Sequence, residues 1–494
     1  MAWPDHPVVH EIFTWAWLTE LGAQQGRELT LADVPAEIWD DIARPGIDAV
    51  WLMGVWQRSP LGAEIARRHP AMRAAHLAAL PGYRDADVVG SAYCIRDYIA
   101  DPRLGGEDGL ALARAALADR GVRLVLDLVP NHVAPDHRWV QDHAEYFIQG
   151  TPDDLAREPD AFLPIGDRVL ARGRDPYVPP WPDVLQLDAS HAGLRAAMVE
   201  LVDGLARRCD AVRCDMAMLL LDDVFARTWG RRARNGPRAS GRDYWPTLID
   251  ATRAAHPEFQ FWAEAYWDLE PALLRHGFDA CYDKRLYDRI ARGGAVDVAA
   301  VRAHLGADLA FQRRTIRFVE NHDEPRAASM LSPAEHRVAL ATVFTLPGIA
   351  LLHDGEAEGR RVRVPVTLGR RPVEQPDVEL RGFVGRLLAA LAGGLRRGRW
   401  SMLPVWGWPD NPSAERLLAW SWEDGDRRHL VAVNLSDARA DGRVQLRWTD
   451  LERRAIGFHD LLSGQRFERD GAALAREGLY VALDGHGMHV LELT

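Results

Sequence analysis

Apolar runs of strand length alternate with stretches of helical periodicity over most of the 494 residues. Eight strands are predicted, at residues 8–15, 48–56, 123–130, 211–218, 260–267, 278–284, 315–323 and 349–355. Helical patterns lie between them, for example at 31–43, 107–120, 191–206, 332–344 and 379–394. Apolar strands that alternate with helices are typical of a parallel sheet covered by helices. The pattern therefore predicts a (β/α)₈ TIM barrel, with a doubly wound open sheet as the alternative.

The alternation is interrupted in two places. Residues 133–190 follow the third strand, are rich in Pro, Asp, Arg and Gly, and show no clean period. A structureless loop of that length is uncommon in a compact domain, so we expect a short inserted subdomain. After residue 394 the runs become short and alternating, with Asp/Gly turns between them, which predicts a C-terminal antiparallel β-sandwich over 395–494. Residues 1–132 and 191–394 then form the barrel.

Composition narrows the range of partners and compartments. The net charge of −11 and the pI near 5.9 argue against a nucleic-acid partner or an anionic membrane surface. No run of about 18 apolar residues predicts a membrane span. The first residues lack the basic and apolar regions of a signal peptide, and the four cysteines have no metal-ligand spacing. We therefore expect free buried thiols and a cytoplasmic location, whereas the oligomeric state has no signal in the sequence.

The fourth predicted strand, AVRCDMAM, carries Arg213 and Asp215 among apolar residues. Side chains two apart on a strand share a face, so both should point into the barrel. Ionised groups are rarely buried unless they are paired or functional. An arginine can hold a carboxylate through two hydrogen bonds and keep it ionised, which a carboxylate nucleophile requires. An ion pair that serves only packing is the alternative.

Acidic residues also stand at the ends of other predicted strands. They are Asp127 on the third strand, Asp215 on the fourth, Glu264 on the fifth and Asp323 on the seventh. The carboxyl ends of barrel strands open onto one mouth, where the chemistry of this fold is located. Carboxylates that converge raise one another's pKa, so their grouping is hard to explain by structure alone.

Glu264 differs from Asp215 in its sequence neighbours. These are aromatic, namely Phe261, Trp262, Tyr266 and Trp267, and no arginine is adjacent. Desolvation should raise the pKa of Glu264, which suits a general acid. An ionised carboxylate beside a protonated one is the pair that retaining glycosidases use, with the carboxyl groups about 5 Å apart. Asp323 would then bind sugar hydroxyls or stabilise an oxocarbenium charge.

These residues belong to motifs that resemble the α-amylase family of retaining glycoside hydrolases. Four motifs resemble its short regions in order and strand placement: DLVPNH (127–132), VRCD (212–215), FWAEAYW (261–267) and ENHDEPR (320–326). PPWPDVLQLD (179–188) is similar to a fifth region, and GSAYCIRDYIADPRLGG (90–106) to the loop after the second strand. The resemblance covers nearly the whole chain.

The resemblance implies a role for each matched residue. Asp215 would be the nucleophile, Glu264 the acid/base and Asp323 the transition-state stabiliser. The substrate-binding residues would be Arg213, which orients the nucleophile, Asp127, which supports Arg213 and the barrel mouth, His132 and His322, which bind the sugar, and Tyr93, which stacks on its ring. Asn131 matches a calcium ligand of the family, but the inserted segment has no dense cluster of oxygen ligands, so neither a metal nor a cofactor is predicted.

Departures from the family pattern concern the substrate. Met218 and Leu219 stand where many α-amylases have Lys-His on the leaving-group side, and Gly90 stands where α-glucosidases have an Asp that reads the chain end. Residues 135–147 resemble the branch that transfers maltosyl units to phosphate or a glucan. We expect action on short α-glucosides, and the sequence leaves linkage, chain length and the acceptor open.

Two other classes of function remain as alternatives. A non-catalytic relative of the same fold would bind carbohydrate only, but such relatives have usually lost triad carboxylates. A barrel metallohydrolase would use His132, His322 and Asp323 as ligands. That class typically has two histidines in an H-x-H pattern on the first strand, and the first strand here offers only His10.

Overall fold

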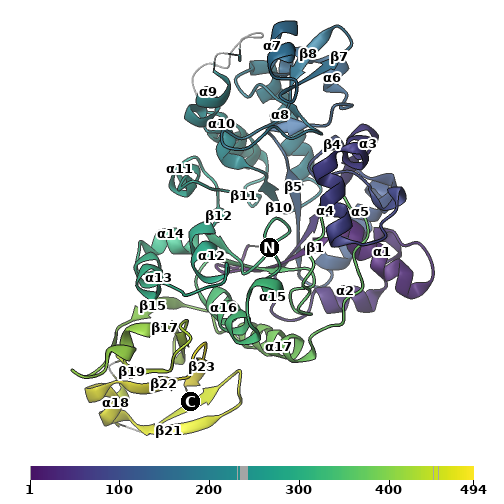
Figure 1. Cartoon of the computed structure of the whole chain (residues 1–494). Helices are drawn as coiled ribbons and strands as arrows, with labels where there is room; N and C mark the ends of the chain where they lie inside the picture. Colours follow the sequence, from purple (N-terminus) through teal and green to yellow (C-terminus); the bar gives the residue numbers. More distant parts are fainter. Residues whose placement is uncertain (1, 231, 234–242, 449, 454, 494) are drawn as a thin grey trace.

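The computed structural model describes residues 2–230, 232–233, 243–448, 450–453 and 455–493. Eight parallel strands close into a barrel in the order β1-β14-β13-β12-β11-β10-β5-β2 (Figure 1). They are β1 (Val8–Phe13), β2 (Ala49–Met53), β5 (Arg123–Leu128), β10 (Ala211–Cys214), β11 (Gln260–Ala263), β12 (Ala280–Tyr282), β13 (Thr315–Arg317) and β14 (Ile349–His353). Each lies within one of the predicted strands. The TIM barrel is confirmed, and the open sheet is wrong.

All eight predicted strands are longer than the observed ones, and in two of them a left-handed residue marks the end. The segment 48–56 turns at Gly54 (φ 77°), and a separate strand, β3 (Trp56–Arg58), follows. The segment 211–218 ends as a strand at Cys214, and Met216 adopts the left-handed region (φ 45°) before the 3₁₀ turn η5 (Ala217–Leu220). Asp215 therefore stands in the turn at the mouth of the barrel rather than within a strand.

Helices surround the barrel and extend its loops. The five predicted helical patterns correspond to α2 (Ala36–Ile42), α5 (Gly106–Ala118), α8 (Ala192–Ala206), α16 (Pro333–Thr345) and α17 (Val378–Ala392). The other barrel helices and loop helices are α1 (Thr14–Gln25), α3 (Pro60–Arg68), α4 (Pro70–Ala79), α9 (Asp222–Trp229), α10 (Tyr244–Ala255), α11 (Glu270–Arg275), α12 (Lys284–Ile290), α13 (Val298–Leu305), α14 (Leu309–Arg313) and α15 (Ala327–Met330). Further 3₁₀ turns are η1 (Leu31–Asp33), η2 (Asp85–Asp87), η3 (Pro102–Leu104), η4 (Ala144–Tyr146), η6 (Pro412–Arg416) and η7 (Leu451–Arg453). Among the described residues, no helix is long and apolar enough to cross a membrane.

The segment between β5 and α8 is organised rather than irregular. Its elements are β6 (His132–Val133), α6 (Trp139–Asp142), α7 (Pro152–Arg157), β7 (Phe162–Ile165), β8 (Arg168–Ala171) and β9 (Leu185–Gln186). The strands form two antiparallel pairs, β6 with β9 and β7 with β8. Phe147, Phe162 and Leu170 are buried and belong to the main apolar core. The predicted inserted segment therefore packs onto the barrel, at the top of Figure 1.

The C-terminal part forms two antiparallel sheets. The six-stranded sheet contains β15 (Arg399–Leu403), β17 (Leu417–Asp424), β18 (Arg427–Asn434), β23 (Met488–Leu493), β20 (Ala455–Asp460) and β21 (Arg466–Asp470). The three-stranded sheet contains β16 (Val405–Trp406), β19 (Ala440–Val444) and β22 (Leu479–Leu483), and α18 (Gly471–Glu477) precedes β22. Apolar side chains of both sheets share a core of their own, which confirms the predicted sandwich.

The sandwich is joined to the barrel through α16. This helix begins at a capping box formed by Ser332 and Glu335. Nearly all its remaining residues are buried, because the six-stranded sheet lies on the side that does not face the barrel. Trp420 and Trp422 donate their ring N–H groups to the carbonyl oxygen of Thr345, at 3.2 and 2.8 Å. They satisfy a carbonyl at the end of the helix that has no partner within it.

Candidate active site

A cavity of about 460 Å³ opens at the carboxyl ends of the barrel strands. Five of the residues predicted from the sequence line it: Tyr93, His132, Asp215, Glu264 and Asp323. The register of β10 and β11 pairs Cys214 with Ala263, so the next residue of each strand, Asp215 and Glu264, enters the cavity from neighbouring positions. The sequence thus identified residues that the fold brings together.

Arg213 stands beneath these carboxylates and is almost completely buried. Its Nη1 lies 2.8 Å from Asp215 Oδ1, and its Nη2 lies 2.8 Å from Glu264 Oε2 and 3.9 Å from Asp323 Oδ2. One guanidinium therefore contacts the carboxylates of three different loops. No arginine is near Glu264 in sequence, yet the fold pairs it with the same arginine as Asp215.

Asp127 lies on β5 opposite Arg213 on β10, as the resemblance implies, but its hydrogen bonds go to other partners. Its Oδ2 accepts the backbone N–H of Gly54 at 3.0 Å, and its carbonyl oxygen accepts the ring N–H of Trp56 at 2.8 Å. The ion pairs of Arg213 among the described residues do not include Asp127. Asp127 supports the barrel mouth by fixing the turn after β2, and it acts on Arg213 only through its electric field.

Burial governs the pKa values of the two carboxyl groups beside Arg213. It raises the pKa of Asp215 to about 6, although Arg213 acts in the opposite direction. It raises the pKa of Glu264 to about 7, again against Arg213. Arg213 thus favours the ionised form of Asp215, as expected, but desolvation outweighs the ion pair and leaves the pKa above its usual value. The order of titration still holds, because Asp215 loses its proton before Glu264.

The carboxyl group of Glu264 is fixed by two donors. The backbone N–H of Met216 donates to Oε2 at 2.6 Å, and the hydroxyl of Tyr266 donates to Oε1 at 2.8 Å. Met216, Trp267 and Asp268 have positive φ angles (45°, 61° and 62°), and among the described non-glycine residues only one other does. Such backbone is costly for a methionine or a tryptophan, and three of the four cases lie in the turns that follow Asp215 and Glu264.

Asp323 is the most open carboxylate of the three, with 43% of its side chain exposed. Its backbone N–H donates to Asn321 Oδ1 at 3.0 Å, which sets the turn. His322 Nε2 lies 3.0 Å from Asp323 Oδ2 and 2.6 Å from the hydroxyl oxygen of Tyr93. Burial works against the ionised form of Asp323, but His322 holds the pKa of this carboxyl group well below its usual range. Asp323 is therefore anionic.

Tyr93 and His132 flank the same cavity from the loops after β2 and β5. The Tyr93 ring lies 5.2 Å from the guanidinium carbon of Arg213 and is stacked on His322 at 5.4 Å. Burial lowers the pKa of His132 to about 3, so its imidazole is neutral. Its ring lies 5.1 Å from that of Trp181.

The side chain of Asn131 is committed to a protein partner. Its Oδ1 accepts a hydrogen bond from Gln186 Nε2 at 2.9 Å, and its carbonyl oxygen accepts another from the same nitrogen at 3.0 Å. In the described part of the chain, no group of three or more His, Cys, Asp and Glu side chains is arranged to hold a metal ion. The surroundings of Asn131 do not fit a calcium site, and the metallohydrolase alternative has no supporting ligand set.

The positions expected to read the substrate lie elsewhere. Met218 and Leu219 are buried in the core and do not line the cavity, so the expectation that they face the leaving group is wrong. Gly90 has a φ of 92°, which disfavours a side chain there. Its carbonyl oxygen accepts from Arg58 Nη1 at 2.5 Å, so the glycine shapes the loop that carries Tyr93.

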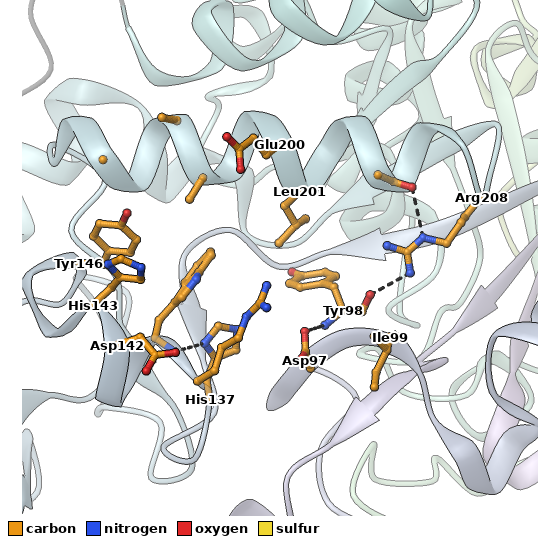
Figure 2. Close-up of a pocket in the computed structure, with 16 residues that line it drawn as sticks. Asp97, Tyr98, Ile99, His137, Asp142, His143, Tyr146, Glu200, Leu201 and Arg208 are labelled. Atoms are coloured by element: carbon orange, nitrogen blue, oxygen red, sulfur yellow. Dashed lines mark hydrogen bonds between the residues drawn. The ribbon is translucent and has the colours of Figure 1, made fainter.

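A second cavity, of about 710 Å³, is larger and lies between α8, β4 (Ile95–Ala100) and the inserted segment (Figure 2). It contains none of the predicted site residues. Its walls include the stretch 135–147, with His137, His143 and Tyr146. The rings of His143 and Tyr146 are stacked at 4.6 Å, and His137 Nδ1 accepts the N–H of Trp139 at 3.1 Å. The stretch that resembles the transferring branch therefore lines this cavity and not the carboxylate cavity.

Several cavity or supporting residues were not found from the sequence. Met216, Trp181 and Tyr266 line the carboxylate cavity, and a methionine or an aromatic residue gives no sequence signal that separates a binding surface from a core. Glu11 on β1 contacts His322. It carries the same signal as Arg213, a charge within a buried apolar strand, and that signal could have found it.

Comparison with known proteins gives the following relatives. No protein-family model matches the chain. Alpha-amylase MalA of Haloarcula japonica is 24% identical over 407 residues, which cover 79% of this chain and 49% of that protein. This chain thus spans about half the length of the curated relative. An α-amylase structure from Lactobacillus plantarum has a TM-score of 0.70 at 18% identity, with 99% of both chains covered.

The α-amylase of Geobacillus thermoleovorans, solved in complex with acarbose, has a TM-score of 0.68 at 16% identity and covers 100% of this chain and 99% of its own. The fold is therefore that of the α-amylases. Together with the similarity to the curated α-amylase, it confirms the resemblance of the motifs to the α-amylase family.

Proposed function

We propose that this protein is a retaining α-glycoside hydrolase or transglycosylase that acts on short α-glucosides through a covalent glycosyl-enzyme. The observation that carries the proposal is the contact of Asp215, Glu264 and Asp323 with one buried arginine in one cavity. Carboxyl groups with different affinities for protons are what a double displacement needs. The names of the similar proteins support an α-glucan substrate.

Asp215 is the nucleophile in this mechanism. Arg213 donates from Nη1 to Oδ1 at 2.8 Å, which fixes the rotamer of the carboxylate. Asp215 attacks the anomeric carbon of the sugar and displaces the glycosidic oxygen, to which Glu264 gives its proton. The ionised Glu264 then takes a proton from the acceptor, which attacks the glycosyl-enzyme and releases Asp215.

Asp323 stabilises the positive charge that develops on the sugar ring. It is anionic and half open to the cavity, so it needs little reorganisation when that charge forms. Tyr93 presents a ring that suits the apolar C–H face of a sugar, and the neutral His132 provides a hydrogen bond to its hydroxyls. The sequence assigned this role to His322 as well, but both of its nitrogens face protein partners and it does not line the cavity. The acarbose complex of the similar structure supports a carbohydrate ligand for this protein.

The acceptor decides between hydrolysis and transfer. Water gives a hydrolase, and a second sugar or phosphate gives a glucosyl- or maltosyl-transferring enzyme from the same intermediate. We also propose that the reaction needs neither a metal nor a cofactor, because Asn131 is already paired with Gln186. The four buried free cysteines support a reducing, cytoplasmic environment.

Trapping of the intermediate tests the proposal. A fluorinated α-glucosyl fluoride that slows the second step should add one glycosyl group to the protein, and peptide mapping should place it on Asp215. Asp215→Asn should give no adduct, whereas Asp142→Asn in the second cavity should label as the unchanged protein does. An adduct on another residue, or a product with inverted anomeric configuration by NMR, would contradict the mechanism.

Incubation with maltooligosaccharides, trehalose and sucrose, with and without phosphate, then identifies the substrate and the acceptor. Binding of these sugars without any turnover would instead support the non-catalytic alternative.

A further inference from the structure

Glu11 is a buried carboxylate that the proposed reaction leaves without a role. It lies on β1, and its side chain is fully buried. Its Oε1 lies 2.5 Å from His322 Nδ1. A carboxylate in such a place is costly unless it is paired, and the histidine is the partner that the structure gives it.

The other nitrogen of the same ring also faces acceptors. His322 Nε2 lies 3.0 Å from Asp323 Oδ2 and 2.6 Å from the Tyr93 oxygen. A neutral imidazole has a proton on only one nitrogen, so the second would present a lone pair to a carboxylate. Two carboxylates on opposite sides of one ring therefore both find a donor only if both nitrogens are protonated.

Two aromatic rings pack against the His322 ring. Trp51 meets it in an edge arrangement at 5.5 Å, and Tyr93 is stacked on it at 5.4 Å. Its orientation is thus set by packing and by Glu11 together. Nε2 then hydrogen-bonds with the Tyr93 hydroxyl and lies 3.0 Å from the carboxylate that the mechanism uses.

We propose that Glu11 is a positioning residue that holds His322 in the doubly protonated form, so that the charged ring keeps the neighbouring Asp323 carboxylate ionised. The inference rests on the proposed function, because the proposed function assigns Asp323 its role in the reaction. Glu11 itself lies behind the histidine and does not line the cavity, so it acts through His322 alone.

The charged groups around the ring act in both directions. Glu11 from β1, Asp323 beside it and Asp127 from β5 favour the cation, and Arg213 from β10 opposes it across the cavity. Burial works against the charged form of His322, but Asp323 and Glu11 raise its pKa to about 10. Burial also keeps the phenol of Tyr93 neutral, because it raises its pKa well above the usual value.

The protonation state can be measured without a substrate. The protein is labelled with ¹⁵N-histidine, and the His322 signals are assigned by their loss in His322→Asn. In the unchanged protein both ring nitrogens should show the shifts of an imidazolium from about pH 5 to about pH 9. A neutral His322 at about pH 7.5 in the unchanged protein would overturn the proposal, whatever the activity.

Glu11→Gln keeps the shape and a hydrogen-bond acceptor but removes the charge. We expect His322 to be neutral at about pH 7 in this variant, where the unchanged protein keeps it charged. The turnover number should fall by at least tenfold at about pH 7, with a smaller change in KM. Glu11→Asp, which keeps the charge, should partly restore both the titration of His322 and the turnover number. An unchanged titration of His322 in Glu11→Gln would overturn the inference.

Asp460→Asn is the matched control. It removes the same kind of pair, Asp460 Oδ2 with His489 Nδ1 at 2.7 Å, in the C-terminal sandwich. Its turnover number and pH profile should equal those of the unchanged protein. If Glu11→Gln is not soluble, the titration of Glu11→Asp decides, since the proposal requires an imidazolium there. Inactivity of the unchanged protein on every glucoside would instead contradict the proposed function. The NMR titration would then still test whether Glu11 keeps His322 doubly protonated.

Discussion

The carboxylate cavity and the cavity beside α8 differ in a way that their sizes do not indicate. The smaller one, of about 460 Å³, contains Asp215 and Glu264, both buried against one arginine. The larger one, of about 710 Å³, has charged side chains too, but Arg138, Asp142 and Glu200 are exposed to solvent. Volume therefore does not locate the chemistry. Charges that are buried and forced together do, because their proton affinities are then changed.

The aromatic residues of the larger cavity have a structural explanation. Tyr146 packs on His143, and its ring lies 5.2 Å from that of His191, the residue that caps α8. His191 Nδ1 accepts from the N–H of Gly193 at 3.1 Å. The cluster thus fixes the inserted segment to the start of a barrel helix. The smaller cavity has strained backbone and unlike carboxyl groups, which packing does not require.

The largest difference between the cavities should come from Asp215→Ala. Loss of the nucleophile should lower the turnover number at least about a thousandfold, each tenfold being ~1.4 kcal/mol in the barrier. The folded state should persist, because burial disfavours the charge that is removed. Steady-state kinetics with an activated aryl α-glucoside and a thermal melt measure both effects. Retention of more than about a tenth of the activity would show that Asp215 is not the nucleophile.

Glu264→Gln should have a large effect that depends on the leaving group. Without the acid, substrates with poor leaving groups should lose about a hundredfold to ten-thousandfold in rate, while those that need no protonation keep more of the first step. Added azide should restore turnover by attacking the glycosyl-enzyme without a general base, and the product should be an α-glucosyl azide. No azide product in this variant would show that Glu264 is not the acid/base.

The pH profile should follow from the same two groups. Asp215 must be ionised, so kcat/KM should rise as the pH rises through about 6. Glu264 must be protonated, so kcat/KM should fall as the pH rises through about 7. A narrow optimum between the two follows, and each limb belongs to the interacting pair rather than to one residue. In Glu264→Gln the alkaline limb should disappear. A flat profile from about pH 5 to about pH 9 would contradict this electrostatic description.

The segment after Asp215 contains both a cavity residue and core residues, and it offers a prediction about stability. Met218→Lys with Leu219→His places charges in a fully buried turn. We expect the free energy of unfolding to fall by roughly 3 kcal/mol or more and the melting temperature to fall by several degrees. Activity on long glucans should not increase. Met218→Leu, which conserves volume, is the control and should change stability by less than about 1.5 kcal/mol. A stable double variant with a new preference for starch would show that positions 218 and 219 do face the leaving group of the substrate.

The sequence predicted the barrel and the triad for separate physical reasons. Strands such as β5 and β14 are short apolar runs between helices, and few folds other than a parallel barrel are compatible with that pattern. The charges of Arg213 and Asp215 were informative because the residues around them are apolar. The strand ends were less accurate, since a methionine at position 216 gives no sign of a left-handed turn.

Contacts between distant segments could not be predicted. The pairing of Arg213 with Glu264 depends on the register of β10 with β11, and the pKa of Asp215 depends on how deeply the cavity is buried. Glu11 could have been recognised from the sequence as an unusual charged residue. It stands in the same apolar strand as His10, but its partner is 311 positions away, so its role appears only in the fold.

The smallest effect is expected in the larger cavity, and it completes the comparison. Asp142→Ala and Glu200→Gln change exposed carboxylates on α6 and α8. Water screens charges in such positions, so each change should alter stability by less than about 0.5 kcal/mol. The turnover number should stay within twofold of the unchanged protein on every glucoside that it accepts. Asp142→Ala makes the same chemical change as Asp215→Ala, and the ratio of their activities measures how much the position of a carboxylate contributes. A loss beyond about tenfold in either variant would mean that the larger cavity takes part in the reaction after all.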